Sequence, residues 1–208
     1  MKNNVIKNQI KVLKELDKMT SKDASRASLN VICIDKKNNV VVATDGHVLG
    51  CVSIYYFNDI DYLKNICPNS GLFFKDINEN YAIIYNSKFS VNVNNDFIST
   101  FIYPNYKRVI PNINDLPNYY TNSENKCYFD FDILKQSFEF FKIFNSNSIS
   151  EFYNNILTGE HLGACLLNCC PKFNAFCLLM PMRVNDDKNE NLKEDLKECI
   201  TFENLTNH

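Results

Sequence analysis

An amphipathic helix followed by short β-rich runs is the feature that most constrains the fold of this chain. Apolar residues between Val5 and Met19 recur at helical spacing and form one broad face. Leu29–Ile34 and Asn39–Ala43 are β-rich and flank a polar turn, as in a hairpin, and Leu49–Phe57 is a third run. This order favours an α+β fold with antiparallel sheets covered by helices on one face.

The same alternation of helix and strands continues along the chain. A short helix is predicted at Asp59–Cys67, ended by Pro68 and Gly71, and another at Phe131–Phe144 with Asp130 as its N-cap. Further strands are predicted at Leu72–Lys75, Tyr81–Tyr85, Phe89–Val93, Phe97–Ile102, Ile149–Leu157, Leu162–Asn168 and Asn174–Met180.

Composition divides the chain into four parts and restricts its class. Residues 1–110 form one predicted domain and 126–183 a second, joined by a Pro- and Asn-rich linker at 111–125 and followed by a polar tail at 184–208. A net charge of −2 argues against a protein that binds nucleic acid with its whole surface. The sequence shows no cleavable signal and no apolar run of membrane-spanning length, which predicts a cytoplasmic protein.

The nine cysteines show no paired metal-site spacing. Cys165, Cys169 and Cys170 lie in an apolar run, so buried reduced thiols are the favoured interpretation and a metal site the alternative. We therefore expect no metal and no cofactor. An acid–base pair of His47 and Asp45 would need a nucleophile or a metal that the sequence does not provide, so an enzyme is not expected.

Lysines form a row on the first helix. At 100° per residue, four of them fall within roughly 60° of one another, opposite the apolar face. The row consists of Lys7, Lys11, Lys14 and Lys18, and Lys22 is predicted to continue it. Such a row suits the phosphates of duplex DNA, although a solvated helix face chosen for solubility has the same pattern.

Three short sequence motifs, which we call the three phrases, point to a specific family. They are Thr44-Asp45-Gly46-His47-Val48-Leu49, Tyr103 to Pro111, and Met180-Pro181-Met182-Arg183. In this order they resemble the bacterial DNA sliding clamp, the β subunit of DNA polymerase III. Residues 26–53 resemble its middle domain almost continuously, and residues 126–183 resemble the second half of its last domain. The resemblance implies the processivity fold of βαβββ units, with basic helices that face DNA.

In that family the three phrases meet in an apolar groove that docks short motifs of polymerases and repair proteins. Leu, Val, Met and Pro side chains suit such a groove, because they form an adaptable apolar floor for Leu or Phe anchors. Closure of an ordinary core between two lobes is the alternative. The residues carried over are Thr44, Gly46, His47, Val48, Leu49, Pro104, Arg108, Val109, Met180, Pro181 and Met182.

Two functions are compatible with this resemblance. One is a sliding-clamp-like processivity factor that tethers a polymerase through the groove and contacts duplex DNA through the lysine row. The other is a monomeric decoy or adaptor that binds the same peptides without encircling DNA. The second is considered because the residues that carry the ring interface in the family have no recognisable counterpart in this sequence.

Overall fold

The structure is a computed structural model and describes residues 2–86, 93–110, 130–144, 152–153, 165–170 and 175–180. Its α-helices are α1 (Lys2–Lys18), α2 (Ile60–Ser70), α3 (Asn95–Thr100) and α4 (Phe131–Phe144), and short 3-10 turns are η1 (Ala24–Leu29), η2 (Ile54–Phe57) and η3 (Tyr106–Val109). Its strands are β1 (Ile32–Asp35), β2 (Val40–Thr44), β3 (Val48–Ser53), β4 (Phe73–Asp76), β5 (Tyr81–Tyr85), β6 (Phe152–Tyr153), β7 (Cys165–Cys170) and β8 (Ala175–Leu179).

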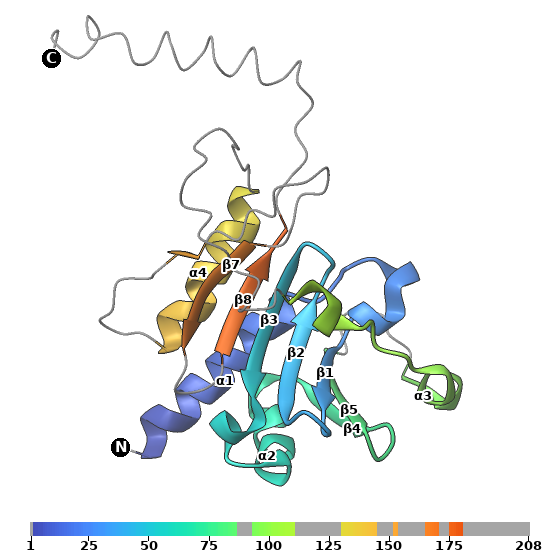
Figure 1. The fold of residues 1–208 in the computed structure, drawn as a ribbon. Helices are drawn as coiled ribbons and strands as arrows, with labels where there is room; N and C mark the ends of the chain where they lie inside the picture. Colours follow the sequence, from blue (N-terminus) through green and yellow to red (C-terminus); the bar gives the residue numbers. More distant parts are fainter. Residues whose placement is uncertain are drawn as a thin grey trace, which may run out of the picture.

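The strands form one antiparallel sheet in the order β4-β5-β1-β2-β3-β8-β7-β6 (Figure 1). The expected α+β class with helices against an antiparallel sheet is confirmed. The order is symmetric about the junction of β3 and β8. Moving outward from it, one side has β3, β2 and β1, and the other has β8, β7 and β6. The chain thus holds two helix-and-three-strand units, α1 with β1–β3 and α4 with β6–β8, which meet through their last strands.

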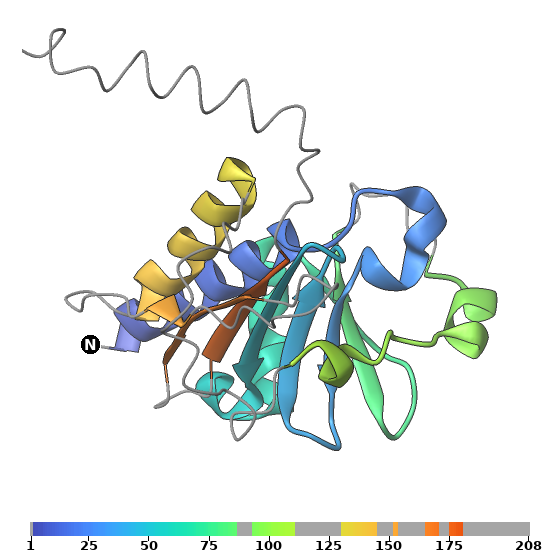
Figure 2. The same ribbon diagram turned by 45° about the horizontal axis from the view of Figure 1, so that its top comes forward.

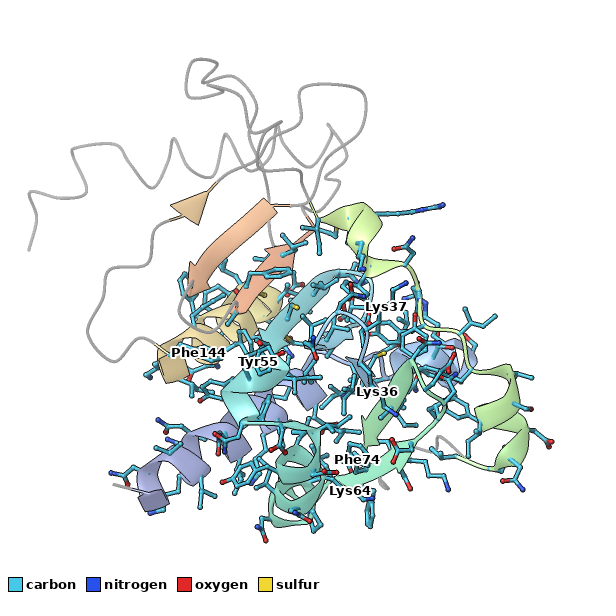
Figure 3. All side chains as sticks on the ribbon, turned by 60° about the horizontal axis from the view of Figure 1, so that its bottom comes forward. Lys36, Lys37, Tyr55, Lys64, Phe74 and Phe144 are labelled. Atoms are coloured by element: carbon cyan, nitrogen blue, oxygen red, sulfur yellow. The ribbon has the colours of Figure 1, made fainter. Side chains whose placement is uncertain are left out.

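Helices α1, α2 and α4 cover one face of the sheet (Figure 2). Helix α1 buries Val12, Leu13 and Leu16, and Met19 is buried directly after its end; all four are fully inaccessible to solvent, as the helical spacing predicted. Helix α4 packs beside α1, and Phe144 at its end meets the ring of Tyr56 edge-on with centroids 5.1 Å apart (Figure 3 labels Phe144). We call the core on this face the helix-side core.

The other face carries a second apolar cluster, and none of the long helices among the described residues lies over it. Strand residues alternate between the faces, so β3 sends Val48 and Val52 to the helix-side core and Leu49 and Cys51 to the opposite face. There they pack beneath Phe101 and neighbouring aromatic residues of the segment 101–110. We call this the outer face.

The structure corrects three local predictions. Phe97–Ile102 was predicted as a strand but holds helix α3, which Asn94 caps by accepting a hydrogen bond from the Phe97 amide at 2.8 Å. The predicted strand Leu49–Phe57 turns into η2 after Ser53, whose hydroxyl accepts from the Tyr55 amide. Pro68 does not end α2, which continues to Ser70 and stops at Gly71 in the left-handed conformation.

One predicted helix cap was confirmed, and several predicted segments lie outside the described residues. Asp130 caps α4 as expected, because its Oδ1 accepts from the amides of Asp132 and Ile133 at 2.8 and 3.2 Å. The linker at 111–125, the tail at 184–208 and nearly all of the predicted strand 89–93 lie outside the described residues. Both predicted domains contribute strands to the single sheet.

Candidate functional site

The turn between β2 and β3 is shaped by its own side chains. Thr44 Oγ1 accepts from the Gly46 amide at 3.0 Å, and Asp45 Oδ1 accepts from the amides of His47 and Val48 at 2.8 and 3.0 Å. Gly46 has φ +96°, a conformation that side chains disfavour. The Thr-Asp-Gly sequence therefore sets the turn that presents His47 immediately before β3.

Met180 joins the third phrase to this turn. Strand β8 pairs with β3 in antiparallel register, with Leu178 opposite Leu49 and Leu179 opposite Val48. The Met180 amide extends the ladder by donating to the His47 carbonyl at 2.8 Å. Residues about 130 positions apart in sequence are thus held side by side by main-chain hydrogen bonds.

The second phrase crosses the outer face of the sheet and is fixed there by two tyrosines. The Tyr103 hydroxyl donates to the Val42 carbonyl at 3.4 Å, and the Tyr106 hydroxyl donates to Asp35 Oδ2 at 2.9 Å. Burial raises the pKa of both phenols, and for Tyr106 the bond to the Asp35 carboxylate raises it further. Both phenols therefore stay protonated at neutral pH and hold the segment as donors.

These three segments enclose an apolar pocket of about 300 Å³, which we call the docking pocket. Leu49 and Leu178 of the sheet form its floor, and Pro104 and Val109 of the crossing segment line its wall. Eight of the eleven predicted groove residues line it: Thr44, Gly46, His47, Val48, Leu49, Pro104, Val109 and Met180.

The remaining predicted groove residues do not join this lining. Arg108 is exposed on η3 and is not among the residues that line the pocket. Pro181 and Met182 lie outside the described residues. Val48 is 1% exposed and packs its side chain into the helix-side core, so it offers the pocket its main chain rather than an apolar surface.

Five further residues line the docking pocket without having been predicted: Arg26, Leu29, Asn105, Tyr106 and Leu178. Arg26 is the most informative, because its Nη1 donates to the Asp45 carbonyl at 2.8 Å and its guanidinium covers Gly46. A Cβ atom at Gly46 would come within 3.3 Å of that nitrogen. Arg26 and Leu29 lie within the stretch 26–53 that resembles the clamp, which is the signal that could have pointed to them.

The docking pocket offers apolar contact with a polar rim, and the Asp45 carboxylate beside it is already hydrogen-bonded within the turn. His47 Nδ1 is 3.8 Å from Asp45 Oδ1, but that oxygen already accepts two main-chain hydrogen bonds. Behind the floor, burial raises the pKa of the Cys51 thiol to about 12. The arrangement is suited to binding a short apolar segment, with His47 and Arg26 available to its polar groups.

The lysines of α1 lie on the face of the helix away from the core. Lys7, Lys11, Lys14 and Lys18 are all exposed, and Lys18 pairs with Glu15 at 2.7 Å. Lys22 does not extend the row, because α1 ends at Lys18. Its ammonium donates to the Asp17 carbonyl at 3.2 Å, and its partial burial lowers its pKa.

No family model matches the chain. Searches of curated proteins and of solved structures also give no significant match. Within the described part of the chain, none of the helices is both long and apolar enough to cross a membrane. The same residues contain no cluster of His, Cys, Asp and Glu that suits a metal ion, and Cys165, Cys169 and Cys170 have no described side-chain positions.

Proposed function

We propose that this chain is a sliding-clamp-like processivity factor that docks short peptide motifs of DNA polymerases or repair proteins. The observation that carries the proposal is the convergence of the three phrases on the docking pocket. The phrases begin at Thr44, Tyr103 and Met180, far apart in sequence, yet they share one concave apolar surface. An ordinary core contact would fill this space with side chains, whereas here it stays open.

The arrangement of the two helix-and-three-strand units supports the same proposal. Helices α1 and α4 lie together on one face, and the docking pocket lies on the other. DNA contact through Lys7, Lys11 and Lys14 and peptide docking therefore use opposite faces of one sheet. A tether for a polymerase needs such a separation, because both partners must be bound at the same time.

Peptide binding tests the docking pocket directly. The probe is a fluorescein-labelled peptide with neighbouring Leu and Phe anchors, followed by anisotropy. Val109→Asp places a charge on the pocket wall and is expected to weaken binding at least tenfold, because a carboxylate is costly to bury against an apolar ligand. Ile102→Asp is the matched control, since Ile102 is 78% exposed and lies outside the lining.

If the Kd of the Val109→Asp variant is within twofold of that of the unaltered protein, the docking pocket is not the binding site. Failure of the unaltered protein to bind the peptide would remove the proposed function. Folding of both variants is checked by circular dichroism, so that loss of structure is not mistaken for loss of binding.

Association with duplex DNA tests the lysine row. Replacing Lys7, Lys11 and Lys14 by Glu is expected to lower the salt dependence of binding by a log–log slope of about 3, one phosphate for each lysine. The control carries Lys37→Glu, Lys75→Glu and Lys107→Glu, three exposed lysines outside α1, and so has the same net charge. Equal losses in the two variants would show a net-charge effect and contradict contact through α1.

A monomeric decoy or adaptor remains the second candidate, and one observation favours it. Among the described strands β4 is an edge strand; it is four residues long and carries exposed Lys75 and Asp76, features that oppose pairing with a second chain. Light scattering separates the candidates: a multimer with salt-sensitive DNA association supports the processivity factor. A monomer that binds the peptide and competes with a complete clamp supports the adaptor.

A further inference from the structure

A second hollow lies on the other side of the Pro104–Tyr106 segment. It has a volume of about 490 Å³ and is bounded by the β1–β2 turn, the β4–β5 turn and residues 103–107. It shares Pro104, Asn105 and Tyr106 with the docking pocket, so these three residues form a wall between neighbouring hollows. We call it the polar pocket, because its lining is mainly charged, amide and hydroxyl side chains.

The floor of the polar pocket is a carboxylate whose acceptor sites are largely occupied. Asp35 is 4% exposed, and it accepts hydrogen bonds from the Asn38 amide at 3.0 Å, from Asn38 Nδ2 at 2.6 Å and from the Tyr106 hydroxyl at 2.9 Å. A carboxylate satisfied in this way stabilises the turn and the η3 segment. It offers little to a ligand.

The free charge of the polar pocket is positive. Lys37 and Lys107 are exposed and line it from opposite segments, and neither forms an ion pair within the described part of the chain. The neighbouring Lys36 differs, because its ammonium is held by Asp76 at 2.9 Å and by the Asn78 carbonyl at 2.8 Å (Figure 3 labels Lys36 and Lys37). Two exposed ammonium groups beside amide side chains suit an acidic ligand.

Resting on the proposed function, we propose that the peptide in the docking pocket continues across Pro104 and places acidic residues in the polar pocket. Because the two hollows share this wall, they lie next to each other, and one extended chain that crosses Pro104 can occupy both. The partner is therefore a peptide with apolar anchors and an acidic flank. Lys37 and Lys107 select it through charge, while the docking pocket holds the anchors.

Three labelled peptides with the same Leu and Phe anchors test this inference at low salt. One has neutral Asn and Gly flanks, one has Asp and Glu before the anchors, and one has them after. One acidic peptide is expected to bind about five- to tenfold more tightly than the neutral one, and the gain is expected to vanish near 0.5 M salt. The other acidic peptide reports the direction of the chain across Pro104.

Charge reversal identifies the lysines responsible. The double variant Lys37→Glu/Lys107→Glu is expected to abolish the gain from the acidic flank while leaving the Kd of the neutral peptide within twofold. It is also expected to favour a peptide with a Lys flank instead. Lys64→Glu/Lys75→Glu is the matched control, because both lysines are exposed and lie outside both pockets.

The outcomes separate this inference from the function on which it rests. Equal binding of the neutral and acidic peptides, or equal loss of the gain in the control variant, overturns the acidic flank and leaves the docking pocket standing. Absence of binding by all three peptides overturns both. A gain that depends on Lys37 and Lys107 and reverses with the Lys-flanked peptide supports the inference.

Discussion

The two faces of the sheet are covered by different kinds of structure, and the docking pocket and the polar pocket lie on the same face. Helices α1, α2 and α4 cover the helix-side core, where apolar residues at helical spacing meet the strands closely enough that Gly50 has no room for a side chain. A Cβ atom there would lie 2.4 Å from Met19 Sδ and 3.0 Å from Leu16 Cδ2. Within the described residues, the outer face has no long helix and is crossed by the segment 101–110 with its short turn η3.

The two faces differ because a helix and an extended segment pack against a sheet in different ways. An amphipathic helix offers a broad apolar face, whereas an extended segment touches the sheet only through alternate side chains. Phe101 and Tyr103 are such alternate contacts, Tyr106 of η3 adds a third, and hollows remain on either side of Pro104. A well-filled face gives the fold its stability, and the partly covered face provides space for a ligand.

The largest expected difference between the faces is in the cost of truncating a leucine. Leu16→Ala leaves a closed cavity beneath α1, and we expect the free energy of unfolding to fall by about 2–5 kcal/mol. Leu49→Ala, on the floor of the open docking pocket, is expected to cost about 1–3 kcal/mol, because the space it leaves joins an existing hollow. Urea denaturation measures both. An equal or larger loss for Leu49→Ala would contradict the comparison.

Periodicity predicted the helix-side core well, because burial there follows a repeating pattern. The spacing of Val12, Leu16 and Met19 identified the buried face of the first helical segment. The range of α4 was also predicted, but Phe131 and Phe138 on it are 76% and 37% exposed. Residue composition predicted the wrong secondary structure where a local hydrogen bond determines it. Phe97–Ile102 has strand-like composition, yet the Asn94 cap and the contacts of Phe97 and Phe101 favour a helix.

The candidate site was predicted from three short sequence motifs, the phrases named above, rather than from hydrophobic periodicity. The three phrases named eight of the residues that line the docking pocket, and the turn chemistry of Thr44, Asp45 and Gly46 is readable from residue type. The polar pocket was not predicted. It depends on Tyr106 reaching Asp35 across 71 positions, a contact that no local pattern reveals.

Alkaline pH tests whether the outer face is as dry beneath its segment as the helix-side core. Burial raises the pKa of Cys51 on the outer face and of Cys67 in α2 to about 12. Because an unfolded thiol titrates near 8.5, each contributes stability that is complete below that pH and is lost as pH rises toward 12. By pH 10 we expect each thiol to have cost about 2 kcal/mol of unfolding free energy.

The alanine variants of these two cysteines separate the faces. Cys51→Ala and Cys67→Ala should flatten the alkaline slope of stability equally, whatever each substitution does to stability at pH 7. The comparison uses the slope between pH 8 and pH 10, measured by denaturant unfolding under reducing conditions. A much smaller change for Cys51→Ala, together with rapid labelling of Cys51 by a thiol reagent, would show water beneath the segment.

The smallest expected effect concerns the hydrogen bond that fixes the segment to the outer face. Tyr106→Phe keeps the ring but removes the donor to Asp35, and we expect a loss of about 1–2 kcal/mol, since Asn38 still donates two bonds to that carboxylate. Tyr55→Phe is the matched control, because Tyr55 is 70% exposed. If the two variants unfold at the same urea concentration, the ring of Tyr106 alone holds the wall between the pockets. A loss confined to Tyr106→Phe assigns that role to its hydroxyl, and the wall then depends on one buried polar contact rather than on apolar packing.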